Sequence, residues 1–124
     1  MSIESLSQTI QEKTSALYTA KLVDELGNAI PAAAILSLQL TYYDERTLQI
    51  INSRNAQNIL NVNNVTLDAL GILVWSLQPA DTSILTVGVA LESHVAMFVW
   101  TWSVPLKTGC HEVRMRIEAV QYAL

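Results

Sequence analysis

Cysteine is almost missing from this chain, which carries a single one, Cys110, among 124 residues. One thiol cannot close an internal disulfide, so the fold must be held together by packing and hydrogen bonds. Glycine and proline are also scarce, with 4 and 3 copies. They stand between apolar stretches and divide the chain into segments of strand length.

Basic residues are few and scattered: there are 7 of them, the formal net charge is −4 and the pI is near 4.9. Phosphate binding relies on clustered Lys and Arg, so the composition argues against a nucleic-acid partner. The longest apolar runs, 29–36 and 95–100, fall well short of the ~20 residues that span a bilayer. The first dozen residues contain Glu4 and no basic cluster ahead of an apolar core. We therefore expect neither a membrane span nor a secretory signal.

Apolar residues, in contrast, are abundant. They make up 51% of the chain against 15% charged residues, and the mean hydropathy is +0.30. A chain of this length forms one ordinary domain with a single core. Because the composition is apolar for a small domain that stands alone, we expect part of its surface to meet another protein.

Apolar and polar residues alternate in several segments, which is typical of half-buried β-strands. One parity of the segment 34–42 is apolar throughout: Ala34, Leu36, Leu38, Leu40 and Tyr42. The last long segment follows the same pattern, with Val113, Met115, Ile117 and Ala119. The other expected strands are 17–23, 46–52, 72–77, 83–89 and 95–103. We therefore predict an all-β fold, an immunoglobulin-like antiparallel β-sandwich of about seven strands.

The first residues are open to two interpretations. Ile3, Leu6 and Ile10 have the spacing of one stripe of a short helix, and they also fit an extended arm. We favour the arm, and divide the chain into an N-terminal arm, 1–13, and a sandwich domain, 14–124.

Asparagines recur at every third position from Asn52 to Asn64, with Asn63 in addition. This spacing gathers side chains on one face of neither a helix nor a strand. Asparagine tolerates left-handed backbone conformations and bonds to its own backbone. The segment is therefore expected to be a loop of successive turns.

Residues that carry chemistry form no recognisable motif. His94, Cys110 and His111 lack the paired spacings that hold zinc, and no Gly-x-Ser-x-Gly elbow is present. The acidic pairs 24–25 and 44–45 fall at expected strand ends, where solvated turn residues are ordinary. We expect no catalytic residue, no metal and no cofactor, and hence a protein that is not an enzyme.

The stretch "HVAMFVWTWS", 94–103, is apolar on both parities. A strand that is apolar on both faces needs a second cover, either from the N-terminal arm or from a neighbouring subunit. The residues expected at a protein interface are Ile3, Leu6, Ile10, Val95, Met97, Val99, Trp100 and Trp102. A second hypothesis makes the asparagine-rich loop a receptor- or glycan-binding surface, since loops on a rigid sandwich often bind. Its contact residues would be Asn52, Arg54, Asn55, Gln57 and Asn58.

Four stretches carry a resemblance to a known group of proteins. They are "YTAKLVDELGNAIPAA" from Tyr18, "LTYYDERTLQIINSRNAQNIL" from Leu40, "GILVWSLQPAD" from Gly71 and "ESHVAMFVWTW" from Glu92. Within them lie Asp24-Glu25-x-Gly27, Asn52-x-Arg54 with Gln57-Asn58, and Glu92-x-His94. Over about 18–120 the chain resembles the small immunoglobulin-like virion structural proteins of tailed bacteriophages and prophages.

The resemblance implies a non-enzymatic virion component, made in the bacterial host cytoplasm. Its place would be that of a capsid-associated accessory or decoration protein, or of a head–tail connector; the alternative is a receptor- or glycan-binding module on the tail. The implied partners are capsid, portal or connector and tail subunits, together with further copies of the chain in a symmetric homo-oligomer.

Overall fold

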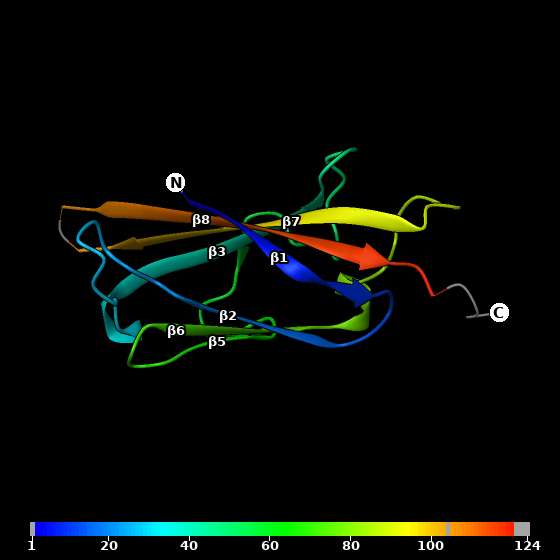
Figure 1. Cartoon of the computed structure of the whole chain (residues 1–124). Coiled ribbons are helices and arrows are strands. Elements are labelled where there is room, and N and C mark those ends of the chain that lie inside the picture. The colour runs from blue at the N-terminus through cyan, green and yellow to red at the C-terminus, as the bar shows by residue number, and fades with distance from the viewer. Residues whose placement is uncertain (1, 104, 121–124) are drawn as a thin grey trace.

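Two β-sheets lie face to face in the computed structural model, which describes residues 2–103 and 105–120 (Figure 1). The five-stranded sheet has the order β1 (Ser2–Gln11), β8 (Lys107–Glu118), β7 (Leu91–Trp102), β3 (Ile35–Asp44) and β4 (Gln57–Asn58). The three-stranded sheet has the order β2 (Ala16–Lys21), β6 (Ile72–Leu77) and β5 (Val65–Leu67). Two 3₁₀ helices, η1 (Ala32–Ala34) and η2 (Pro79–Asp81), lie in the connections. Neither of these short helices, within the described residues, is long and apolar enough to cross a membrane.

The strand order confirms the predicted all-β sandwich. The order β2-β6-β5 opposite β3-β7-β8 is that of the two sheets of an immunoglobulin-like domain. All neighbouring strands are antiparallel except β1, which pairs in parallel with β8.

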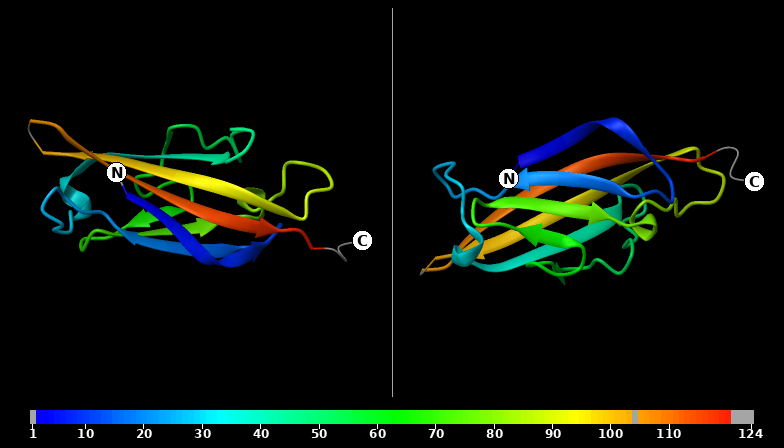
Figure 2. Two further views of the ribbon diagram at one scale, coloured as in Figure 1. Left: turned by 45° about the horizontal axis from the view of Figure 1, so that its top comes forward. Right: turned by 90° about the horizontal axis from the view of Figure 1, so that it is seen from below.

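The first segment is extended, as expected, but it belongs to a sheet. Both views of Figure 2 show β1 running alongside β8 at the edge of the five-stranded sheet. Since β8 separates β1 from β7, the first strand does not cover the second face of β7. The N-terminal arm is therefore not the second cover of that strand.

Two of the predicted strands, 46–52 and 83–89, are wrong, because side chains take the backbone groups that a strand would pair. At the first, the Asp44 carboxylate accepts hydrogen bonds from the backbone N–H and the hydroxyl of Thr47, which closes a turn. At the second, the Glu92 carboxylate accepts from the N–H groups of Leu85 and Thr86. Both segments are therefore held as irregular connections.

A register shift in β3 explains another difference. Between Ile35 and Ser37 the pairing with β7 slips by one residue, so that Ile35 faces the core while Leu36 is 56% exposed. Beyond this bulge Leu38, Leu40 and Tyr42 are fully buried, as predicted. The alternation assigned to Ala34 and Leu36 was wrong, because a bulge inverts the parity of the residues before it.

The core is built around the ring of Trp75. The ring of Tyr42 meets it edge-on at 5.1 Å and that of Phe98 at 5.9 Å, between centroids. Tyr18 stacks on Phe98 at 5.8 Å, and the guanidinium carbon of Arg54 lies 5.5 Å from the Trp75 ring. The predicted inner face of the last strand is confirmed, with Val113, Met115 and Ile117 at 0% exposure.

One tight contact in this core is testable. Gly109 lies opposite Trp100 in the β7–β8 ladder, and a Cβ added at Gly109 would lie 2.5 Å from Cε2 of the indole. We expect Gly109→Ala to lower the free energy of unfolding by about 1–3 kcal/mol, because the indole must shift. The exposed neighbour gives the control: Thr108→Ala should stay within about 0.5 kcal/mol in the same urea titration. Equal effects of the two substitutions would contradict this packing.

Candidate functional site

The outward-facing side of the five-stranded sheet carries an apolar stripe, which we call the outer stripe: Val95, Met97, Val99 and Cys110. Side chains alternate between faces along a strand, so Val95, Met97 and Val99 on β7 point away from the core. Cys110 on β8 lies directly opposite Val99 and extends the stripe sideways. Val95 is only 4% exposed because the protein's own side chains cover it, which corrects its assignment to an interface. Met97, Val99 and Cys110 are half-buried.

Polar and charged groups border the outer stripe. Arg114, opposite Val95, forms an ion pair with Glu45, with 2.7 Å between Nη2 and Oε2. Glu112 lies opposite Met97. Burial, with Glu112 nearby, raises the pKa of the Cys110 thiol. The thiol is therefore held protonated, which makes it a small apolar group and a poor nucleophile.

The other predicted interface residues lie elsewhere. Trp100 and Trp102 face the core at 4% and 9% exposure, so their assignment to an interface was wrong. They follow the parity of Phe98, and the three-stranded sheet already covers that face. Leu6 and Ile10 are partly buried against the protein's own core, and their place at an interface stays a prediction. Ile3 pairs with Glu112 along β1, and its side chain lies outside the described residues.

The asparagine-rich segment is a series of turns, as predicted. Asn52, Asn61, Asn63 and Asn64 all have positive φ, between 53° and 73°. Asparagine is among the few residues that adopt this left-handed conformation readily. Short pairings interrupt the turns at β4, which contains Gln57 and Asn58, and at β5.

Arg54, expected to be a loop contact, is instead the buried centre of this segment at 1% exposure. Its Nε and Nη2 donate hydrogen bonds to the two carboxylate oxygens of Asp81, at 2.7 and 3.0 Å. Its remaining N–H groups bond to the Gln57 side chain, the Asn63 carbonyl and the Asn64 side chain. A guanidinium that uses all of its donors internally has none left for a ligand.

The rest of the predicted loop contact divides in the same way. Asn52 donates from its side chain to Asp81, and Gln57 accepts from Arg54. Asn55 and Asn58 are exposed. Asn52 is exposed as well, so three of the five predicted contact residues face outward.

A hollow of about 670 Å³ lies between β1 and β2, and few ionisable side chains line it. Its ionisable lining consists of Glu4 and Tyr18, and the Tyr18 hydroxyl donates to Glu4 at 2.7 Å. Burial and this bond raise the pKa of Tyr18. His111 Nε2 lies 3.1 Å from both Glu4 Oε1 and the Tyr18 hydroxyl, so the three side chains form one hydrogen-bonded group.

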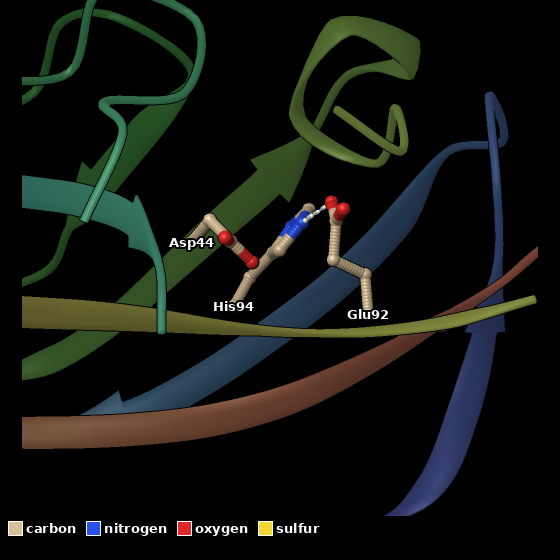
Figure 3. A group of neighbouring side chains, drawn as sticks. All are labelled: Asp44, Glu92 and His94. Atoms are coloured by element: carbon tan, nitrogen blue, oxygen red, sulfur yellow. Dashed lines mark hydrogen bonds and ion pairs between the residues drawn. The ribbon is translucent and has the colours of Figure 1, made fainter. Parts of the chain in front are cut away.

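Asp44, Glu92 and His94 form a buried cluster inside the sandwich, at 1%, 6% and 0% exposure (Figure 3). His94 Nε2 lies 2.6 Å from Glu92 Oε1, and His94 Nδ1 lies 3.2 Å from the Tyr42 hydroxyl. Asp44 stands opposite His94 in the β3–β7 ladder. Residues two apart on a strand share a face, which brings Glu92 beside His94.

Hydrogen bonds connect Tyr42, His94 and Glu92 in a chain. The Tyr42 hydroxyl donates to the Asp81 carbonyl at 2.8 Å, and the same oxygen lies 3.2 Å from His94 Nδ1. Burial alone would raise the pKa of Glu92, but bonds from His94 and from the N–H groups of Leu85 and Thr86 outweigh it, and the pKa lies below its ordinary value. Glu92 is therefore a carboxylate that accepts hydrogen bonds from its neighbours.

This cluster was not found from the sequence. Asp44 was expected in a solvated turn at a strand end, and it is buried, which corrects that expectation; His94, which was assigned to no site, is buried beside it. The signal that was present is Glu92-x-His94, a spacing that places both side chains on one face of a strand. The third member is 48 positions away from Glu92 in the chain and joins only through the register of β3 against β7.

We expect the Arg54–Asp81 pair to contribute more to the free energy of unfolding than the Glu45–Arg114 pair. Arg54→Met leaves Asp81 as an unpaired buried charge, so we expect a loss of about 3–5 kcal/mol in the free energy of unfolding. Arg114→Met removes the exposed pair with Glu45 and should cost less than about 1 kcal/mol. Urea titration of both variants checks the difference. A loss of similar size in the two would show that the buried pair does not hold the segment in place.

Comparison of the chain with protein-family models, with curated proteins and with solved structures gives no match. No relative therefore assigns a role to any residue of the chain. The geometry of the outer stripe and of the buried cluster is what supports a function.

Proposed function

We propose that the chain is a non-enzymatic structural domain that assembles with other proteins through the outer stripe. The observation that carries the proposal is the central, uncharged character of this stripe, with charged residues only at its border. Interface centres are depleted in charge and enriched in Met and aromatic residues, with polar groups at the rim. Met97 and Val99 would form the centre, and the Glu45–Arg114 pair the rim.

The flatness of a sheet face suits a partner of similar shape. A second copy of the chain can place its own outer stripe on this one about a two-fold axis, which makes the contact self-complementary. We therefore propose a symmetric homo-oligomer, with other subunits at the remaining surfaces. Affinity would come from buried apolar area and be multiplied by the number of copies.

The biological setting rests on the resemblance described above. By that resemblance, the chain is a component of a tailed bacteriophage virion, as a capsid-associated accessory or decoration protein or as a head–tail connector. A tail-borne receptor- or glycan-binding module is less well supported, because Arg54 and Gln57 are engaged within the protein.

Charge placed in the outer stripe tests this proposal. We expect Met97→Glu combined with Val99→Glu to abolish self-association, because desolvating two carboxylates opposes burial of the stripe. Sedimentation velocity of the purified chain measures the change. The control is Thr19→Glu on the exposed face of the other sheet, which should leave the sedimentation profile of the parent protein unchanged.

Two results would contradict the proposal. One is a parent protein that sediments as a monomer at all concentrations and does not bind to particles. The other is an oligomer that survives the double substitution while circular dichroism shows a native fold. In that second case the contact surface would lie outside the outer stripe.

A further inference from the structure

We propose that Asp44, Glu92 and His94 bind one divalent transition-metal ion of the zinc type. This inference is independent of the proposed assembly function. It rests on the geometry, the supporting hydrogen bonds, the charge and the access of the buried cluster.

The ligand atoms are close enough for one ion. One atom from each of the three side chains lies within 4.8 Å of the other two. Zn²⁺ binds imidazole nitrogen and carboxylate oxygen at about 2.0–2.2 Å, which sets the separation of two neighbouring ligands. In a tetrahedral site a separation of 4.8 Å would have to close by about 1.4 Å. The 2.6 Å between His94 Nε2 and Glu92 Oε1 must open by less than about 1 Å, since neighbouring ligands of a tetrahedral ion are about 3.4 Å apart.

The chemistry of the three ligands selects the ion. Ca²⁺ and Mg²⁺ take oxygen ligands and rarely use imidazole. One imidazole with two carboxylates suits Zn²⁺, and also Co²⁺ as its spectroscopic substitute. With three protein ligands, a water molecule would complete a tetrahedral site.

Each ligand is already oriented by a second group, as in established metal sites. The Tyr42 hydroxyl holds His94 Nδ1 at 3.2 Å, which leaves Nε2 to point at Glu92. Two backbone N–H groups hold Glu92, at 2.9 and 3.1 Å. Thr47 holds one carboxylate oxygen of Asp44, from its N–H at 2.9 Å and from its hydroxyl at 2.6 Å. In this arrangement the metal ion takes the place of the proton between Nε2 and Oε1.

Charge also favours a cation. Two of the three side chains of the cluster are acidic, and they lie close together in the interior. Buried negative charge is costly unless a cation compensates it. The nearby guanidinium of Arg54 is committed to Asp81, so it does not neutralise Asp44 and Glu92.

An ion can reach the cluster from the surface. A hollow of about 310 Å³ is lined by both carboxylate ligands, Asp44 and Glu92, together with Glu45, Arg46 and three residues of 89–93. Glu45 and Arg46 stand at this entrance, where the hollow has room for the water ligand. His94 does not line this hollow.

Metal titration of the full chain tests the site. After treatment with a chelator and its removal, Zn²⁺ should bind with one ion per chain in isothermal titration calorimetry and raise the Tm. Co²⁺ should give the visible absorption bands of a four-coordinate ion. Ca²⁺ and Mg²⁺ at the same concentration should change neither signal.

Three substitutions locate the ion. Asp44→Asn preserves an oxygen acceptor for Thr47 while weakening the ligand, and we expect at least tenfold lower Zn²⁺ affinity. Glu92→Gln should have a similar effect, and it provides a second reading if either variant unfolds. His111→Gln changes the other histidine of the chain, which bonds to Glu4 and Tyr18, and should leave the affinity within twofold.

Several outcomes would overturn the inference. The first is the absence of saturable Zn²⁺ or Co²⁺ binding by the folded chain, which would make the cluster a hydrogen-bonded element of the core and nothing more. The second is binding that His111→Gln removes and Asp44→Asn does not, which would place the ion elsewhere. The third is a preference for Ca²⁺ over Zn²⁺.

Discussion

The buried ion pair between Arg54 and Asp81 is the constraint on which the rest of the structure depends. The segment from 46 to 64 has little regular pairing, yet it must close one side of a sandwich. The Arg54 guanidinium at the centre of this segment uses all of its donors in hydrogen bonds within the protein. Its acidic partner, Asp81, lies in the connection between β6 and β7. The irregular segment is thereby held in one conformation, because every donor of its buried guanidinium has an acceptor.

The same pair connects two parts of the interior. The backbone carbonyl of Asp81 accepts from the Tyr42 hydroxyl, which in turn meets the imidazole of His94. One polar network therefore runs from Arg54 through Tyr42 to Glu92. The Glu92 carboxylate in turn accepts hydrogen bonds from two backbone N–H groups of the connection before β7. The two irregular connections of the sandwich are tied into a single system. Ligand-binding loops are usually left mobile, and the contacts at this end of the domain are of the opposite kind.

The proposed assembly through a sheet face is compatible with this rigidity. Both long connections are engaged internally, and we propose the outer side of the five-stranded sheet as the surface for a partner. A face of this kind needs no rearrangement on binding, so little conformational entropy opposes association. The outer stripe would form the apolar centre of the contact. The Glu45–Arg114 ion pair at its border would lie at the polar rim, which stays accessible to water.

The local patterns in the sequence predicted β2, β3, β6, β7 and β8, missed the short β4 and β5, and predicted the long-range contacts poorly. Alternation identified β3 and β8 because it depends only on which face of a strand is buried. It failed at Leu36, where a bulge changes the parity, and at 46–52, where the Asp44 side chain competes for the backbone. Arg54 was taken for an exposed contact because its partner, Asp81, is 27 positions away along the chain.

The two tryptophans of β7 show the same limit for the candidate site. A strand that is apolar on both faces indicates a second cover but does not say which parity meets it. The three-stranded sheet settles the choice for Trp100 and Trp102, and only Val95, Met97 and Val99 are left on the outer side. The buried cluster of Asp44, Glu92 and His94 needs the pairing of two strands, which periodicity within one strand does not contain.

The central claim is that other subunits cover the outer stripe. It is tested most directly by a structure of the chain inside the particle with which it assembles, at a resolution that shows side chains. We predict that side chains of a neighbouring subunit pack on Met97, Val99 and Cys110. A particle in which the chain is held by other surfaces, with this face of the sheet open to water, would contradict the account.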